Sequence, residues 1–531
     1  MSGIKRAIGA VAAGVVVLAV AAGVGAAGLM LPDPLLNSPA LALAPGAVSS
    51  NEGRVATMCL GGVERTVATG VNAAHADEKI RSATGALLAG VAPSAALPRW
   101  QTFTGKAPAV AARGATADTN LGTAVTTPVI SGKFAAKTGL GTAALTGAAS
   151  ISRAVDPEAI LMGGTAHIAS AGDLRGLAHI PCEWPANSMW LVGSSSMVGT
   201  SNRLVLANPT FTNVQVKIRA FTSLGEVPLG TSSLAPLAPQ TIKSISLDGL
   251  VNDDERVAFF LSAEAGQFAA ALQTNALEGF TPAGIDVITA GREGRTVMVP
   301  GLVLPAGQVN LGGIKAAAET GKSARVDSAV KAGVRIVNPN STAHTAAVAL
   351  IGADGVARPL PGGEQVKLVA GGVLDLSLDG VAPGAYTVRV SADGTVAAGA
   401  FVRFDSGTAG KDIAWLASEG AVSHAGAAVG IGTAHLVVTP ALSGEQAQEA
   451  VFSWKAFAAD GKSIAEKKVT AKGSVAIALP AGAAYVSVNS AVPLYAAVAV
   501  RADLGNGSGI SWVPLSQNGA GSSTTRVLFA N

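Results

Sequence analysis

Two short motifs have the residue types of a serine-based acyl-transfer enzyme. Ser328-Ala-Val-Lys331 fits S-x-x-K, in which a lysine amine activates a serine hydroxyl, and Lys137-Thr-Gly139 fits K-T-G. Penicillin-recognising enzymes carry these motifs in the opposite chain order, with an S-x-N motif between them. The sequence contains no G-x-S-x-G elbow. It therefore predicts no catalytic nucleophile.

Residue types that bind metals are scattered along the chain. The histidines stand at positions 75, 167, 179, 344, 424 and 435, with no H-x-x-x-H pair, which leaves a zinc site unsupported. The run Asn252-Asp-Asp-Glu255 has the oxygen ligands that Ca²⁺ prefers, but a solvated turn is the simpler interpretation. Asn340-Ser-Thr342 fits a glycosylation sequon. We predict no catalytic, cofactor-binding or metal-ligating residue and no cofactor.

Composition excludes several classes of protein. Charged residues make up 13% of the 531 residues, the net charge is +3, and aromatic residues make up 4%. No basic stripe indicates nucleic-acid binding, and few aromatic residues are present for stacking on bases or sugars. The mean hydropathy of +0.43 comes from short Ala, Gly and Val runs broken by turn residues. This rhythm is typical of an all-β protein.

The N-terminus predicts the compartment. Lys5 and Arg6 precede an uncharged run from Ala7 to Leu31, which is long enough to cross a bilayer about 30 Å thick as a helix. The positive flank keeps residues 1–6 in the cytoplasm and the bulk outside. We expect a single-pass membrane protein with its anchor at 7–31 and a linker at 32–51. The alternative is secretion after cleavage near Ala44, at an A-x-A site.

The chain has two cysteines, Cys59 and Cys182. In an exported protein an even pair usually forms a disulfide, and a loop of this length stabilises the fold by about 4–5 kcal/mol in the chain-entropy treatment. The alternative is two reduced, buried thiols.

Internal repetition is the strongest signal in the chain. The strand Arg203–Pro209 (RLVLANP) recurs as VRIVNP at Val334–Pro339 and as HLVVTP at His435–Pro440. Each recurrence opens about 100 residues with short alternating strands and Asp-Gly turns. We expect tandem immunoglobulin-like β-sandwiches after the transmembrane helix, with a β-propeller as the alternative. The expected parts are a β-rich N-terminal domain at 52–183, three sandwich units at 184–296, 297–418 and 419–515, and a C-terminal closing strand at 516–531.

Three further local predictions follow from this pattern. Trp415 and Trp512 occupy the same late strand of two units, so we expect core residues, with a ligand platform as the alternative. Trp190 precedes RLVLANP as Trp512 precedes RVLFAN at Arg526–Asn531. We therefore expect the last residues to begin a further unit and to complete a sheet elsewhere. Residues Asp77–Leu88 read as a short helix or a loop.

Four motifs carry a resemblance: Cys182-x-x-Pro185, Trp190-Leu-Val-Gly193, Leu204-x-Leu206-x-Asn208-Pro209 and Gly284-x-Asp286. With them the chain resembles a family of uncharacterised actinobacterial secreted proteins, over roughly Val55 to the C-terminus. The family often has proline after its first cysteine, where this chain has Leu60. The resemblance implies a single membrane span, a β-rich exported region and an envelope location, and it implies no catalytic residues.

Two classes of function remain. The first is a non-catalytic, membrane-anchored extracellular envelope protein that is structural or binds a protein or a cell-wall glycan. The second is an exported enzyme, such as a cell-wall polysaccharide hydrolase, with its site in the N-terminal domain. The first is favoured because the units are alike and no site motif stands out.

Overall fold

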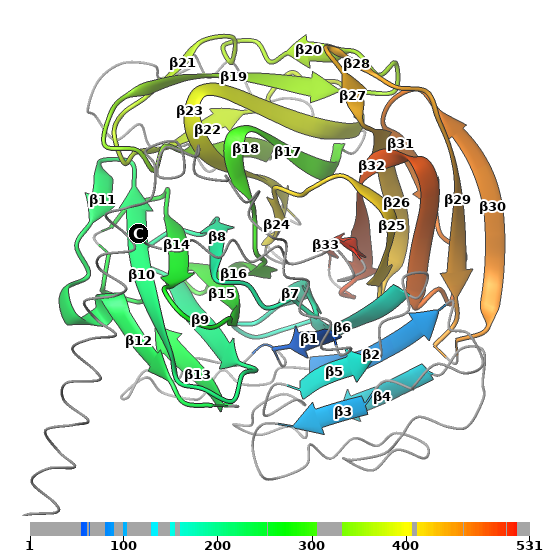
Figure 1. The fold of residues 1–531 in the computed structure, drawn as a ribbon, viewed down its shortest axis with the longest axis horizontal. Helices are drawn as coiled ribbons and strands as arrows, with labels where there is room; N and C mark the ends of the chain where they lie inside the picture. Colours follow the sequence, from blue (N-terminus) through cyan, green and yellow to red (C-terminus); the bar gives the residue numbers. More distant parts are fainter. Residues whose placement is uncertain are drawn as a thin grey trace, which may run out of the picture. The chain divides into compact units, whose positions relative to one another are not determined.

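The computed structural model describes an all-β protein (Figure 1). It describes residues 55–60, 63, 80–89, 99–102, 129–135, 149–153, 160–239, 241–251, 253–304, 332–405, 411–459, 461–505 and 507–517. All of these lie in one compact unit, Gly53–Ala520; a second unit comprises Met1–Glu52 with Gly521–Asn531. Within the described ranges no helix is long and apolar enough to cross a membrane.

The strands fall into four repeats. Repeat 1 contains β1 (Val55–Cys59), β2 (Ile80–Ala89), β3 (Arg99–Thr102), β4 (Val129–Ala135), β5 (Ala149–Arg153), β6 (Ile160–Ala169) and β7 (Gly176–Pro181). Repeat 2 contains β8 (Ser188–Val192), β9 (Thr200–Asn208), β10 (Val214–Thr222), β11 (Gly225–Val227), the 3₁₀ turn η1 (Gly230–Ser233), β12 (Leu234–Leu237), β13 (Thr241–Ser246), β14 (Ala258–Ala263), β15 (Ala269–Glu278) and β16 (Thr281–Ile288).

The second half of the chain continues in the same way. Repeat 3 contains β17 (Glu293–Leu304), β18 (Ala332–Val337), β19 (His344–Ile351), β20 (Ala357–Pro359), β21 (Val366–Leu368), β22 (Val373–Ser377), β23 (Gly384–Asp405) and β24 (Lys411–Ala417). Repeat 4 contains β25 (Val422–Ala428), β26 (Thr433–Pro440), β27 (Leu442–Ser443), β28 (Gln446–Ala447), β29 (Ala450–Phe457), β30 (Ser463–Ala471), β31 (Val475–Ala478), β32 (Tyr485–Asp503), β33 (Ser508–Pro514) and β34 (Ser516–Gln517).

Repeats 1 and 2 each have two antiparallel sheets with a shared strand order. In repeat 2 one sheet runs β11-β10-β14-β8 and the other β13-β9-β15-β16. Repeat 1 has the matching pairs in β3-β5-β1 and β4-β2-β6-β7. In repeats 3 and 4 the long strands β23 and β32 pair with strands of both equivalent groups and join them into one eight-stranded sheet per repeat. The repetition therefore extends to the first part of the chain, where the sequence did not reveal it.

Side-chain alternation places the core between the two sheets. In β10 the residues Val214, Val216 and Ile218 are buried, while Gln215 and Lys217 between them are exposed. This period of two is what a strand needs to bury one face. The buried side chains of β10 pack in one hydrophobic cluster with those of β9 and β15 from the opposite sheet. The apolar alternation of the sequence thus accounts for the sandwiching of the sheets.

The recurring Asn-Pro motif is a turn device. Asn208 is fully buried, and its Nδ2 donates hydrogen bonds to the carbonyl oxygens of Thr212 (2.8 Å), Leu237 (3.2 Å) and Ala238 (3.0 Å). Its Oδ1 accepts the backbone N–H of Thr210 at 2.9 Å. An asparagine amide can thus satisfy several backbone groups where a strand turns away.

Asn338 repeats this geometry in repeat 3. Its Nδ2 donates to the carbonyl oxygens of Thr342 (2.8 Å), Leu368 (3.3 Å) and Val369 (2.9 Å), and its Oδ1 accepts the N–H of Asn340 at 3.1 Å. The motif recurs because two equivalent turns need the same side chain, so the repetition has a structural cause and does not mark a binding site.

The junction between repeats 2 and 3 is held by a buried arginine. The Arg335 guanidinium donates to both carboxylate oxygens of Asp375 at 2.8 Å and to the carbonyl oxygens of Val257 (3.0 Å) and Glu255 (2.9 Å). It also lies 4.8 Å from the ring centroid of Trp415. Because Arg335 belongs to β18 and its carbonyl partners to repeat 2, the side chain links the two repeats.

The closing strand of each repeat is followed by a short linker that returns to the first strand. Met58 in β1 and Glu183 exchange two backbone hydrogen bonds of 2.7 Å. Trp190 in β8 and Gly291 do the same, at 3.3 and 2.7 Å. Glu419 donates to the Met298 carbonyl in β17 at 2.7 Å, and β34 pairs with β25. Every repeat is therefore closed on itself by its own last residues.

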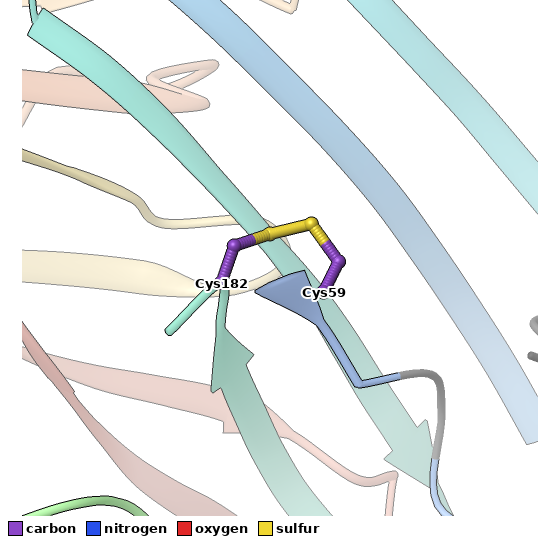
Figure 2. Close-up of a disulfide and its surroundings, with 2 residues drawn as sticks. All are labelled: Cys59 and Cys182. Atoms are coloured by element: carbon purple, nitrogen blue, oxygen red, sulfur yellow. A yellow bond between two sulfur atoms is a disulfide. The ribbon is translucent and has the colours of Figure 1, made fainter. Parts of the chain in front are cut away.

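A disulfide joins Cys59 to Cys182 in repeat 1, the pairing expected from the sequence (Figure 2). Cys59 ends β1, and Cys182 directly follows β7. Both are buried, at 1% and 2% exposed. The bond lies beside the Met58–Glu183 hydrogen bonds and reinforces the closure of this repeat.

Two sequence interpretations are wrong. Trp190 lies in β8, a first strand, whereas Trp512 lies in β33, a closing strand next to β32, so their likeness does not mark the start of a further unit. Residues Ile80–Ala89 form strand β2 between β4 and β6, which excludes the helix and the loop expected there. The anchor at 7–31, the linker at 32–51 and RVLFAN at 526–531 lie outside the described residues.

Candidate functional site

Most residues singled out from the sequence for chemistry do not come together. Lys137, Ser328 and Lys331 lie outside the described residues. Asp254 accepts hydrogen bonds from the backbone N–H groups of Ser223 (3.0 Å) and Arg256 (2.7 Å), so its carboxylate organises a turn. In the described ranges no group of three or more His, Cys, Asp or Glu side chains could hold a metal ion.

The sequon asparagine and the two late tryptophans also have structural places. The Asn340 Nδ2 donates to Asn338 Oδ1 and to the Thr395 carbonyl, both at 2.7 Å, so the atom that a glycan would modify is engaged. Trp415 and Trp512 are 7% and 3% exposed and lie in the hydrophobic core. Trp512 Nε1 donates to the Pro300 carbonyl at 3.0 Å.

The four closing strands meet around one buried carboxylate. Strand β16 packs against β7 and β24, and β33 packs against the same two strands. Asp412, in β24, is fully buried; its Oδ2 accepts the N–H groups of Leu177 (3.0 Å) and Ile510 (2.9 Å), and its Oδ1 accepts that of Ile285 (3.2 Å). One side chain therefore binds the other three closing strands.

Glycines make room for this carboxylate. Gly176, Gly284 and Gly509 each precede one of the three N–H donors. A Cβ on Gly176 would lie 2.4 Å from Asp412 Oδ1, and a Cβ on Gly509 would lie 3.2 Å from Oδ2. Gly176 and Gly284 also have φ values of +148° and +120°, which L side chains rarely adopt. The repeated strand thus carries aspartate in one repeat and glycine in three.

A second buried carboxylate lies in the same junction. Asp286, in β16, is 1% exposed; its Oδ2 accepts the Trp415 N–H at 2.6 Å, and its Oδ1 contacts Ser511 Oγ at 3.4 Å. Ser511 Oγ also accepts the His179 N–H at 2.9 Å. The network therefore includes residues of all four closing strands.

Burial controls the protonation of this junction. It raises the pKa of Asp412 to about 7, against the opposing effect of its N–H donors. It also raises the pKa of Asp286 well above the usual range, and the charge of Asp412 adds to that increase. Arg175 is 2% exposed, and its guanidinium interacts favourably with Asp412. Asp412 therefore interacts with both a second buried acid and a buried arginine.

A carboxylate pair lies where the closing strands end. Glu183 and Glu419 occupy equivalent positions in the linkers after β7 and β24, and both keep part of their surface accessible. Burial raises the pKa of Glu183 to about 8, although a backbone hydrogen bond from Ala290 opposes the shift. Burial and the charge of Glu183 raise the pKa of Glu419, while Arg292 lowers it.

The Glu183–Glu419 pair is the described group best suited to proton chemistry. Carboxyls whose pKa is raised by burial can hold a proton near neutral pH, as general acids do. Arg292 is fixed nearby, because its backbone N–H donates to Ser418 Oγ at 2.9 Å and its carbonyl accepts from that Oγ at 2.8 Å. The arrangement places one arginine near two acids of raised pKa.

Sequence reasoning missed both clusters, although signals for them exist. The closing strands were identified as GIDVIT, KDIAWL and GISWVPL, and Gly284-x-Asp286 was among the motifs of the resemblance. Aligning these strands would place Asp412 level with Gly284 and Gly509. Glu183 and Glu419 are not part of any sequence motif. They are equivalent because each donates its backbone N–H to the first strand of its own repeat, which only the structure shows.

Comparisons with known proteins add a family and little else. No curated protein matches the sequence. The native alpha-2-macroglobulin of Escherichia coli, spanning domains MG0-NIE-MG1, is similar at 11% identity with a TM-score of 0.10, covering 60% of this chain and 94% of that one. The BSP domain of a biofilm-associated protein is similar at 7% identity with a TM-score of 0.10, covering 88% and 96%. One family matches residues 134–480, and the chain therefore belongs to DUF5719, a family of unknown function.

Proposed function

We propose that this protein is a non-catalytic, membrane-anchored component of a cell envelope. It holds its repeats outside the cytoplasm and is structural or binds a protein or a cell-wall glycan. The observation that carries the proposal is how the buried polar residues are used: the recurring Asn208 and Asn338, together with Arg335 and Asp412, all satisfy backbone groups within the fold. The repeated sequence is thus devoted to assembling four units.

The disulfide and the N-terminus support the exported location. A buried disulfide persists in oxidising compartments and is rare in the cytosol, and Cys59 and Cys182 are paired. The apolar run Ala7–Leu31 with Lys5 and Arg6 before it supports an anchor whose N-terminus stays inside. Cleavage near Ala44 would release the same repeats into the medium.

Within this proposal each repeat is an immunoglobulin-like sandwich. The two antiparallel sheets that face one core in repeat 2, and the repeat length of about 100 residues, support that assignment. The cyclic contacts of β7, β16, β24 and β33 favour the alternative of a β-propeller. A propeller blade, however, is usually a single four-stranded sheet of 40–50 residues, whereas repeats 1 and 2 each have two sheets and repeats 3 and 4 each have one sheet of eight strands.

Location and redox state test the proposal together. Intact host cells would be treated with protease, fractionated, and probed for the chain, with a cytoplasmic protein as the control. We expect membrane association, degradation of the bulk from outside, and no reaction of Cys59 or Cys182 with maleimide until a reductant is added under denaturing conditions. A protease-protected chain with two reactive thiols would overturn the proposal.

An exported hydrolase acting on cell-wall polysaccharide is the second candidate. The Glu183–Glu419 pair favours it, because glycoside hydrolases use two carboxyls, one of them with a raised pKa. Glu183 is the last residue of the region expected to hold such a site. The test is release of reducing ends from purified cell wall by the wild type, Glu183→Gln and Glu419→Gln. Activity lost in both variants while folding is unchanged would replace the first proposal.

A further inference from the structure

Three turns at one end of repeat 2 expose large apolar side chains. Val198 is 88% exposed in the turn between β8 and β9, Leu224 is 80% exposed between β10 and β11, and Phe280 is 96% exposed between β15 and β16. Met197, beside Val198, is 38% exposed. We call Met197, Val198, Leu224 and Phe280 the apolar tip. They are four of the nine exposed large apolar side chains among the described residues.

Hydrogen bonds hold the three turns together at one end of the repeat. The Leu277 N–H donates to the Gly199 carbonyl at 2.8 Å, which joins the Phe280 turn to the Val198 turn. The Ser196 N–H donates to the Asp254 carbonyl at 2.8 Å, and the Asp254 carboxylate accepts the Ser223 N–H at 3.0 Å, which joins the Leu224 turn. The apolar side chains therefore project from a connected set of turns.

The tip is electrically neutral. Residues 193–199, 223–225 and 279–282 contain no charged side chain. The charged residues that flank the turns are paired: Glu226 with Arg219 and Glu278 with Lys411, each at 2.6 Å. Two carboxylates lie near the tip: Asp253 is exposed, and Asp254 is partly buried and accepts the Ser223 N–H.

We propose that the apolar tip inserts into the surface of a lipid bilayer. Almost complete exposure on separate turns suits side chains that enter an acyl layer, because lipid fills the space between them. A protein partner usually needs anchors in packed pockets with aromatic and arginine partners around them, and the turns offer serine, glycine and threonine. Neutral turns with the carboxylates of Asp253 and Asp254 nearby favour zwitterionic over anionic lipid.

The inference rests on the proposed function, because the anchor brings the tip to the membrane. Residues 32–54 separate the apolar run at 7–31 from β1 and reach at most about 80 Å when fully extended. A tether of this length keeps the folded unit at a high effective concentration relative to lipid, so a weak insertion suffices.

A fluorescent label at position 280 tests the insertion. The full chain carrying Phe280→Cys would be labelled with an environment-sensitive fluorophore and reconstituted into phosphatidylcholine vesicles. The native cysteines are buried and paired, so they do not take the label. The matched control is Ser443→Cys, at the exposed end of β27 in repeat 4.

We expect the label at 280 to shift to shorter wavelength and to be quenched by lipids brominated on their acyl chains, and the label at 443 to do neither. Adding Val198→Ser and Leu224→Ser should weaken insertion on the order of tenfold or more. These side chains are exposed, so near-UV circular dichroism should stay unchanged. Replacing part of the lipid with phosphatidylserine should not strengthen the signal.

Flotation of the chain with the vesicles separates the two ideas. A chain that does not float contradicts the membrane anchor. A chain that floats while the label at 280 remains in water overturns the apolar tip and leaves the anchor standing. If a label on Val198→Cys also remained in water while the chain floated, the turns would be assigned to contact with a protein and not with lipid.

Discussion

Removing the Asp412 carboxyl is the sharpest test of the junction between the closing strands. Asp412→Ala leaves the N–H groups of Leu177, Ile285 and Ile510 buried without their acceptor. Each unsatisfied donor costs about 1–3 kcal/mol, so the three together amount to about 3–9 kcal/mol. The loss is shared by four repeats, because the donors and the acceptor lie in four different strands.

The pH dependence of that loss distinguishes this mechanism from a simple cavity. Burial raises the pKa of Asp412 from 3.8 to about 7. A raised carboxyl pKa gives stability that is present below pH 3.8 and is lost as the pH rises to 7, about 4 kcal/mol in all and about 2–3 kcal/mol between pH 5 and pH 8. Asp412→Ala lacks this dependence, so it should be more destabilising at pH 5 than at pH 8 by about 2–3 kcal/mol.

Urea unfolding followed by tryptophan fluorescence measures both numbers, since Trp415 and Trp512 lie in the strands concerned. The matched control is Asp503→Ala, an exposed carboxylate that accepts one turn N–H at 2.8 Å; it should change stability by less than about 1 kcal/mol. If Asp412→Ala unfolded at the same urea concentration as the wild type at both pH values, the assigned role of Asp412 would be refuted.

Three further predictions concern other buried polar groups. Asn338→Asp should destabilise by at least about 2 kcal/mol, because it sets an oxygen against three carbonyls; urea unfolding that matches the wild type would contradict the turn mechanism. Arg335→Met should cost about 3–5 kcal/mol by stranding Asp375, and adding Asp375→Leu should recover part of it; a double variant no more stable than the single one would argue against the pair. Burial lowers the pKa of His179 from 6.5 to about 4, so its contribution is present above pH 6.5 and about 3 kcal/mol is lost as the pH falls to 4; His179→Leu should flatten acid unfolding over that range, and an unchanged acid limb would exclude His179.

The sequence predicts the strands of this fold better than it predicts which strands correspond between repeats. Alternation and Asp-Gly turns indicate an all-β chain because they report local burial and local turn geometry. Equivalence between repeats depends on which strands pair, and a tryptophan is too common a core residue to mark that. Trp190 and Trp512 have similar sequence surroundings, yet Trp190 lies in the first strand of repeat 2 and Trp512 lies in the closing strand of repeat 4.

Repeat 1 escaped recognition for a related reason. Its strands β2 to β5 are separated by long Thr-, Ala- and Gly-rich segments, so no spacing of about 100 residues with Asp-Gly turns stands out. What it shares with the other repeats is pairing order and the return of Glu183 to β1. Such a likeness is a property of hydrogen bonding between distant segments, and a single sequence does not display it.

The junction also explains why the repeats could not remain identical. Four equivalent positions converge where the closing strands pack, and they hold Gly176, Gly284, Asp412 and Gly509. One carboxylate there accepts a hydrogen bond from each of the other three strands. A second at Gly176 would collide with the first, since even its Cβ would lie 2.4 Å from Asp412 Oδ1, and the two charges would repel in a buried site. Four glycines would leave the three N–H groups without an acceptor. One aspartate among three glycines satisfies both constraints, so the departure from exact repetition is what allows the repeats to close around one another.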